Sequence, residues 1–215
     1  DPLSPAMSEL AENIDLYVGD VQAGPVLLDD GIAFEDIDGA GFDGGQIRIF
    51  YTAGAHAEDQ LSILASGPVT VVGSEVRVGG TAIGTIDGTE DGVDGAALVI
   101  ALNANADAEA VRQVLERVAF GSDTADGSIN YTYRGIGYLV RDGAGGQTEP
   151  DGVRIYLRPG TSGAETRSIN DWTPGDAAYF SETELQAGPV RLDADVDLDG
   201  FDGDAFDGGY LRVNP

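Results

Sequence analysis

An internal repeat constrains this chain more than any other feature of its sequence. Residues 22–26 read Gln-Ala-Gly-Pro-Val, and the same five residues recur at 186–190, which is 164 positions later. Identities continue at this spacing without a gap and include the Phe-Asp-Gly-Gly motifs at 42–45 and 206–209. Chance does not produce this many ungapped matches over so short a stretch. We therefore expect one complete structural unit followed by the opening strands of a second.

The repeat divides the chain into expected domains. Residues 1–14 are predicted to be a linker, 15–158 a complete β-sandwich repeat, 159–178 a polar inter-repeat linker, and 179–215 the opening strands of a second repeat. The last stretch is too short to bury an apolar face by itself. It therefore docks on the first unit, is completed by further repeats, or completes a neighbouring molecule by strand addition.

Short apolar runs separated by glycine-rich turns fill the first unit. Residues 46–51 place Ile47, Ile49 and Tyr51 on one face, as a half-buried strand requires. Similar runs occupy 61–64, 69–72, 76–78, 82–86, 97–102, 129–133, 138–141 and 153–157. Many short strands with regular turn signals predict an all-β fold, and a repeat strung end to end favours a Greek-key-type β-sandwich over a barrel.

One segment, near residues 107–119, departs from the strand pattern. Four of its apolar residues, beginning at Val111, fall at the i, i+3, i+4 and i+7 positions of one helical face. Asp107 precedes them as a candidate N-cap. We expect a single helix here that crosses from one sheet to the other.

The charge balance is extreme, with 38 acidic residues against 11 basic ones and a net charge of -27. Every basic residue is arginine, and there is no cysteine. Nucleic acid and anionic membrane surfaces are poor partners for such a surface, and no apolar run is long enough for insertion into a membrane. A compact fold with this charge repels itself, so we expect divalent cations or a salty medium to offset it.

Carboxylates that recur in both copies are the candidate metal ligands. Carboxylates on flexible glycine-rich loops suit calcium, which accepts about six to eight oxygens in loose geometry, better than magnesium or a transition metal. Residues 195–200 also resemble the opening of a helical calcium loop, although Phe206 stands where that loop needs glutamate. The plainer interpretation is that these aspartates form turns and add solubility. The candidate ligands are Asp29, Glu35, Asp38, Asp43, Asp193, Asp195, Asp197, Asp199, Asp202 and Asp207.

Three further segments are secondary candidates for metal binding: Glu58-Asp59, the stretch from Asp87-Gly88 to Asp94-Gly95, and Asp142-Gly143 near the end of the unit. Each of them is expected to be a plain turn.

A series of motifs resembles a known bacterial repeat family. It runs from the Phe-Asp-Gly-Gly-Gln-Ile motif at 42–47 through Ala-Glu-Asp-Gln-Leu-Ser-Ile at 57–63 and Val-Gly-Gly-Thr at 78–81 to Val-Arg-Asp-Gly-Ala-Gly-Gly-Gln-Thr at 140–148. The series is similar to the cadherin-like repeats of giant RTX-type adhesins and hemolysin-like calcium-binding proteins of proteobacteria. The resemblance implies a cadherin- or Ig-like sandwich, stiffened by calcium, in an extracellular, cell-surface or secreted protein.

The resemblance also implies what such a module contacts and what it does not do. Its expected partners are neighbouring repeats or identical subunits, with host or surface glycans as further candidates. We expect no enzymatic activity, because His56 is the only histidine and no nucleophile elbow or phosphate-binding loop is present. The alternative is a subunit of a polymeric filament, sheath or surface layer that assembles by strand addition through residues 179–215.

Overall fold

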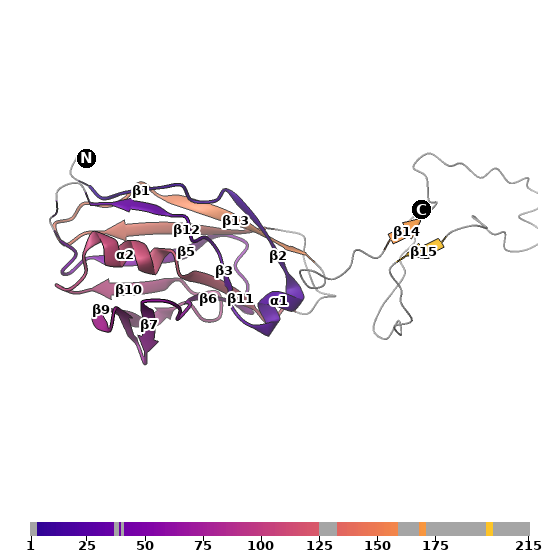
Figure 1. The fold of residues 1–215 in the computed structure, drawn as a ribbon, viewed down its shortest axis with the longest axis horizontal. Helices are drawn as coiled ribbons and strands as arrows, with labels where there is room; N and C mark the ends of the chain where they lie inside the picture. Colours follow the sequence, from indigo (N-terminus) through magenta and orange to yellow (C-terminus); the bar gives the residue numbers. More distant parts are fainter. Residues whose placement is uncertain are drawn as a thin grey trace, which may run out of the picture. The chain divides into compact units, whose positions relative to one another are not determined.

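The chain forms two units, residues 1–162 and 163–215. The computed structural model describes residues 4–36, 39, 41–124 and 133–158, together with the backbone of 168–170 and 197–199. The first unit is an all-β sandwich, as the sequence predicted, with two helices in its described part (Figure 1).

The larger sheet of the first unit has eight strands. In spatial order they are β2 (Asn13–Tyr17), β13 (Asp151–Arg158), β12 (Arg134–Arg141), β5 (Gln46–Ala53), β10 (Leu98–Leu102), β9 (Thr81–Asp91), β8 (Glu75–Val78) and β7 (Val69–Val72). All neighbours are antiparallel except β2 and β13, which run parallel with Ile14 opposite Ile155.

Two smaller sheets complete the unit. One has the order β3 (Val26–Leu27), β11 (Val118–Ser122) and β6 (Asp59–Ile63), and the other pairs β1 (Ala6–Ser8) with β4 (Ala33–Glu35). Inward side chains from the eight-stranded and three-stranded sheets belong to one hydrophobic core, which includes Ile49 of β5, Leu61 of β6 and Phe120 of β11. The core therefore lies between these sheets and joins them.

The strands follow the alternation of their residues. In β5, Ile47 and Ile49 are fully buried, while Arg48 between them points outward and is half-buried. The hairpin between β8 and β9 turns at Gly79 and Gly80, whose φ angles are 58° and 85°. A two-residue turn with positive φ at both positions matches the right-handed twist of the strands and favours glycine. The predicted strand at 129–133 falls mostly outside the described residues.

Along the chain, the longer helix, α2 (Ala108–Leu115), follows β10 of the larger sheet and precedes β11 of the three-stranded sheet. It therefore connects one sheet to the other, as predicted. The side chain of Asp107 accepts a hydrogen bond from the backbone N–H of Ala110 at 2.8 Å, which confirms it as the N-cap. The predicted range of 107–119 is too long, because Val118 begins β11 and pairs with β6.

A second, six-residue helix, α1 (Val18–Ala23), was not predicted. It is too short for its apolar residues to show a helical period. Only Val18 and Val21 turn toward the core.

The second unit contains a strand pair that resembles the first strand pair of the first unit. Strand β14 (Ser168–Asn170) pairs antiparallel with β15 (Asp197–Asp199), with Ile169 opposite Leu198. In the first unit β1 pairs with β4 in the same sense, with Met7 opposite Phe34. Strands β4 and β15 are related by the offset of 164 found in the sequence, whereas the partners Met7 and Ile169 are 162 positions apart, so the register of the second ladder differs by two residues. The two units therefore share an antiparallel strand pair at equivalent places in the repeat, but not its register.

This pairing also places strands in segments that the sequence analysis assigned to linkers. Residues 1–14 contain β1 and the start of β2, and residues 159–178 contain β14. Each unit thus opens with a short strand that precedes the segment expected to begin the sandwich.

Candidate metal centre

The turn after β12 meets the loop before β5 at one end of the sandwich. The backbone N–H of Gly143 donates a hydrogen bond to the carbonyl of Gly41 at 3.1 Å. A Cβ on Gly143 would lie 2.2 Å from the carbonyl oxygen of Asp43. Only glycine permits so close an approach of two backbones. The contact brings a residue of the predicted ligand set, Asp43, next to the Asp-Gly pair at 142–143.

Asp142 is the most unusual carboxylate at this junction. It is only 2% exposed. Its Oδ1 accepts hydrogen bonds from the backbone N–H groups of Ala144 and Gly146, both at 2.8 Å. Its Oδ2 is buried and has no hydrogen-bond partner among the described residues. A buried carboxylate oxygen without a partner is costly, so it is a position where a cation would stabilise the fold.

The surroundings of that oxygen are tight. A Cβ on Gly146 would lie 2.4 Å from Asp142 Oδ2 and 3.2 Å from the Cα of Ser4. The N-terminal segment therefore passes directly over the turn, and the turn holds its carboxylate between that segment and the loop before β5.

The structure separates the predicted ligands of the first copy. Each carboxylate oxygen of Asp29 accepts a backbone hydrogen bond, Oδ2 from Ala11 at 2.7 Å and Oδ1 from Gly31 at 2.8 Å. The carboxylate of Asp29 therefore connects the backbone at Ala11 to the backbone at Gly31. Glu35 is exposed at the end of β4, and Asp43 is exposed in the loop before β5.

The remaining predicted ligands have no described side chains. Asp38, Asp193, Asp195, Asp202 and Asp207 lie outside the described residues, and Asp197 and Asp199 are described only as backbone of β15. Within the part of the chain that the structure describes, no three His, Cys, Asp or Glu side chains are grouped so that they could hold a metal ion.

Two of the secondary candidate segments, 58–59 and 87–95, have structural roles. In the 87–95 segment, Oδ1 of Asp87 accepts hydrogen bonds from the backbone N–H of Glu90 at 2.9 Å and from the hydroxyl and backbone N–H of Thr89. The hydrogen bond from Glu90 is the largest of these influences, and together they hold the pKa of Asp87 below its ordinary value.

Asp59, in the other pair, is fully buried and forms an ion pair with Arg134. Its Oδ2 lies 3.0 Å from Arg134 Nε and accepts the backbone N–H of His56 at 3.1 Å, and its Oδ1 accepts the hydroxyl of Ser122 at 2.8 Å. Asp59 belongs to the smaller sheet and Arg134 to the larger one. The pair therefore ties the two sheets together across the core.

This cluster also affects Tyr51, whose hydroxyl is buried nearby. Burial raises the pKa of Tyr51, the negative charge of Asp59 raises it further, and Arg134 opposes the shift. The sequence analysis missed Arg134. Its position in the sequence could have indicated burial, because alternate residues of a strand face the same side and Arg134 alternates with the inward-facing Ile136, Tyr138 and Val140.

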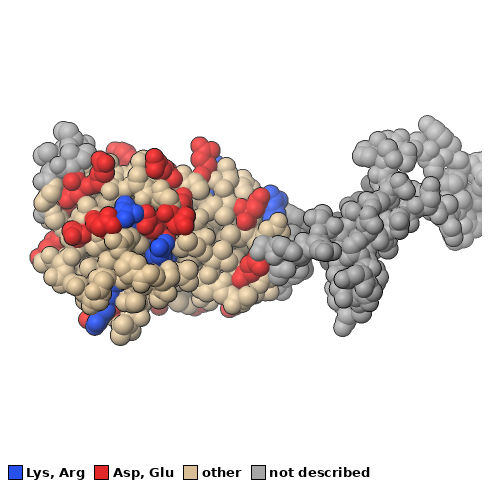
Figure 2. Space-filling model, in the orientation of Figure 1, with Lys and Arg blue, Asp and Glu red and all other residues tan. Residues whose placement is uncertain are grey.

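Acidic side chains gather on part of the surface. Figure 2 shows them mainly over the upper part of the visible face of the first unit, with few arginines among them, while most of that face carries uncharged residues. Neither helix in the described part of the chain has the length and apolarity needed to cross a membrane.

The fold and the junction define an acidic all-β sandwich with an internal repeat. No family model, curated protein or solved structure matches this chain.

Proposed function

We propose that this chain is a non-enzymatic, calcium-stabilised repeat module of a bacterial cell-surface adhesin or a related large secreted protein. Two features support a tandem module. The sequence repeats at an offset of 164, and β14 pairs antiparallel with β15 as β1 does with β4, although in a register that differs by two residues. Repeat proteins of this kind gain their stability unit by unit and project a chain over distance.

The observation that carries the calcium part of the proposal is the buried, unpartnered Oδ2 of Asp142. Calcium accepts carboxylate and backbone carbonyl oxygens, and both are present where the turn after β12 touches the loop before β5. Asp142 and Asp43 would hold the ion from the two sides of this junction. Asp38, five positions before Asp43 in the sequence and outside the described residues, is the third candidate.

A bound calcium ion would add positive charge to a strongly acidic chain. With a net charge of -27, like charges push the acidic loops apart in its absence. By mass action, calcium at 100 times its dissociation constant adds about 2.7 kcal/mol per site. For a protein of this size that corresponds to a rise of about 5 to 10 °C in the thermal midpoint.

The test is the thermal midpoint of the whole chain in chelator and with calcium added, with magnesium and matched ionic strength as controls. The key variant is Asp142→Asn, and the matched control is Asp123→Asn, which makes the same change at an exposed aspartate. We expect Asp142→Asn to lose the calcium-specific rise. In chelator it should be at least as stable as the unchanged protein, because it removes an unpaired buried charge.

Two results would count against the proposal. A midpoint that responds to calcium no more than to the salt control would leave the acidity as an adaptation for solubility or high salt. Undiminished calcium stabilisation of Asp142→Asn would move the ion away from this junction. Concentration-dependent filaments that disappear when residues 179–215 are removed would favour the strand-adding surface polymer instead.

A further inference from the structure

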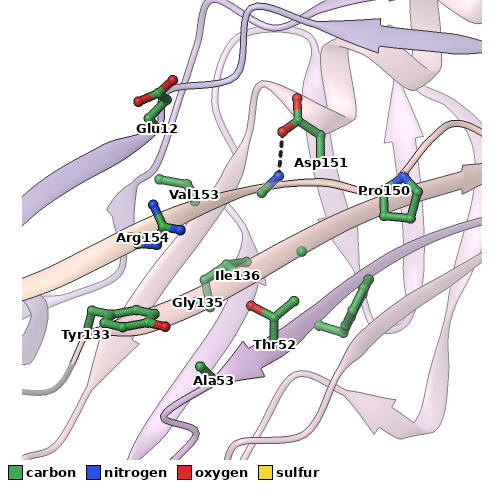
Figure 3. A pocket seen from close by; sticks show the side chains of 13 residues that line it. Glu12, Thr52, Ala53, Tyr133, Gly135, Ile136, Pro150, Asp151, Val153 and Arg154 are labelled. Carbon is green, nitrogen blue, oxygen red and sulfur yellow. Dashed lines mark hydrogen bonds between the residues drawn. The ribbon is translucent and has the colours of Figure 1, made fainter.

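A groove of about 520 Å³ lies on the outward face of the larger sheet, across β5, β12 and β13 (Figure 3). It lies toward the beginning of β12, whereas Asp142 follows the end of that strand. The groove residues of β12, Gly135 to Gly137, come five to seven residues before Asp142, so at about 3.3 Å per residue the two places are roughly 17 to 23 Å apart. The groove is therefore separate from the candidate metal centre.

The floor of the groove is backbone covered by two side chains of β5. A Cβ on Gly135 would lie 2.3 Å from the hydroxyl of Thr52, and a Cβ on Gly137 would lie 2.7 Å from the ring of Phe50. Thr52 and Phe50 thus lie over these glycines and fill the space that side chains of β12 would take. The groove is therefore floored by the Phe50 ring and the Thr52 hydroxyl, and the guanidinium of Arg48 lies over the Phe50 ring, 5.7 Å from its centre.

One arginine stands over this floor. Among the residues that the structure describes, Arg154 of β13 is the only basic one that lines the groove, and its guanidinium lies 5.7 Å from the ring centre of Tyr133. The other two arginines near it on this face are ion-paired, Arg48 with Glu90 at 2.7 Å and Arg158 with Asp15 at 2.9 Å.

Arg154 differs from them because it forms no ion pair with any residue that the structure describes. Arg141, at the other end of β12, also lacks an ion pair with a described residue, but it donates a hydrogen bond to Gln147 at 3.2 Å and does not line the groove. Held by the Tyr133 ring, the planar guanidinium of Arg154 is arranged to receive a carboxylate.

Two carboxylates set a limit on the ligand. Glu12 and Asp151 also line the groove, and Asp151 accepts the backbone N–H of Gly152 at 2.8 Å. Their negative charge disfavours phosphate and other dianions near Arg154. The same oxygens accept hydrogen bonds from hydroxyl groups.

We propose that this groove binds a sugar that carries a single carboxylate, such as a hexuronate unit of an acidic polysaccharide. Its carboxylate pairs with Arg154, its hydroxyls donate to Glu12 and Asp151, and its ring packs against the part of Phe50 that lines the groove. A pocket of several hundred Å³ with few convergent polar groups is typical of small-ligand sites. This activity is independent of calcium and goes beyond the proposed stabilising role.

The probe is trigalacturonate, titrated into the whole chain in chelator and physiological salt, with binding followed by calorimetry or by NMR. The fully methyl-esterified trisaccharide is the ligand control. Arg154→Gln is the key variant, and Arg141→Gln is the matched control, because Arg141 is exposed on the same face at the other end of β12. We expect the acid but not the ester to bind, with affinity about tenfold or more weaker for Arg154→Gln and unchanged for Arg141→Gln.

Several results would overturn the proposal. These are no binding of trigalacturonate, equal binding of the ester, or equal binding by Arg154→Gln. Tighter binding of a glutamate-rich peptide would assign the groove to an acidic protein partner instead. Binding that appears only with calcium would place the sugar on an ion rather than on Arg154. Because the main titration is done in chelator, its outcome does not depend on whether the candidate metal centre binds calcium.

Discussion

The buried ion pair between Asp59 and Arg134 gives the sharpest test of how the two sheets are held together. We consider the substitution Arg134→Met, which keeps much of the aliphatic length and removes the charge. In the native structure the side chains of Arg134 and Asp59 are 2% and 0% exposed. After the substitution Asp59 keeps its bonds to Ser122 and His56 but loses its cation.

Removing one partner of a buried ion pair typically costs about 3–5 kcal/mol, because the remaining charge has no compensation. For a protein of this size that cost corresponds to a fall of roughly 6 to 20 °C in the thermal midpoint. The double variant Asp59→Asn/Arg134→Met removes both charges. It should recover much of the loss, because no unpaired charge then remains in the core.

Arg158→Met provides the matched control. Arg158 and Asp15 are 2.9 Å apart, nearly the same distance as the buried pair, but their side chains are 50% and 55% exposed. This surface pair should cost about 1 kcal/mol or less to break. Urea unfolding followed by far-UV circular dichroism measures all four proteins. If Arg134→Met costs no more than Arg158→Met, or if the double variant is no more stable than the single one, burial is not what makes this pair important.

Three further predictions follow from the described contacts. The pKa values of buried Tyr51 and Tyr138 are raised above the ordinary 10.0, so their contribution to stability is full below that pH and is lost as pH rises. The free energy of unfolding should therefore fall above pH 10 by about 1.4 kcal/mol per pH unit for each tyrosine. Tyr138→Phe should make this dependence on pH less steep. An unchanged slope would refute the contribution of Tyr138. Asp107→Ala should cost about 1 kcal/mol in urea unfolding through loss of the α2 N-cap, and no loss would mean that the cap is replaceable. Gly143→Ala should destabilise the chain in chelator as well as in calcium, because its Cβ would meet the carbonyl of Asp43 at 2.2 Å; equal midpoints would contradict this packing.

The strands of the larger sheet could be predicted because burial on one face leaves a period of two in the sequence. The run at 69–72 is the observed β7, and the run at 46–51 extends by two residues in β5. The helix could not be delimited in the same way. Val118 is buried at the start of β11, and the core needs an apolar residue there whichever backbone carries it.

The candidate site was less predictable than the fold. An Asp-Gly pair in a turn looks the same in sequence whether its carboxylate is solvated or, as at Asp142, buried with one oxygen unpartnered. Asp59 and Arg134 are 75 positions apart, so their pairing follows only from the packing of two sheets. The recurring aspartates identified the loop before β5, but the residue that gives it an unsatisfied charge lies in the turn after β12.

The parallel pairing of β2 with β13 determines how the first unit responds to force. The first strand of the larger sheet along the chain and the last one lie side by side in five registered pairs, from Asn13 opposite Arg154 to Tyr17 opposite Arg158. Because the strands point the same way, pulling on the two ends of the unit slides them past each other and loads all the bonds of the ladder at once. In an antiparallel pair at this place, the hydrogen bonds would break one after another, starting from the loaded end. The topology therefore makes the unit resist tension along its length.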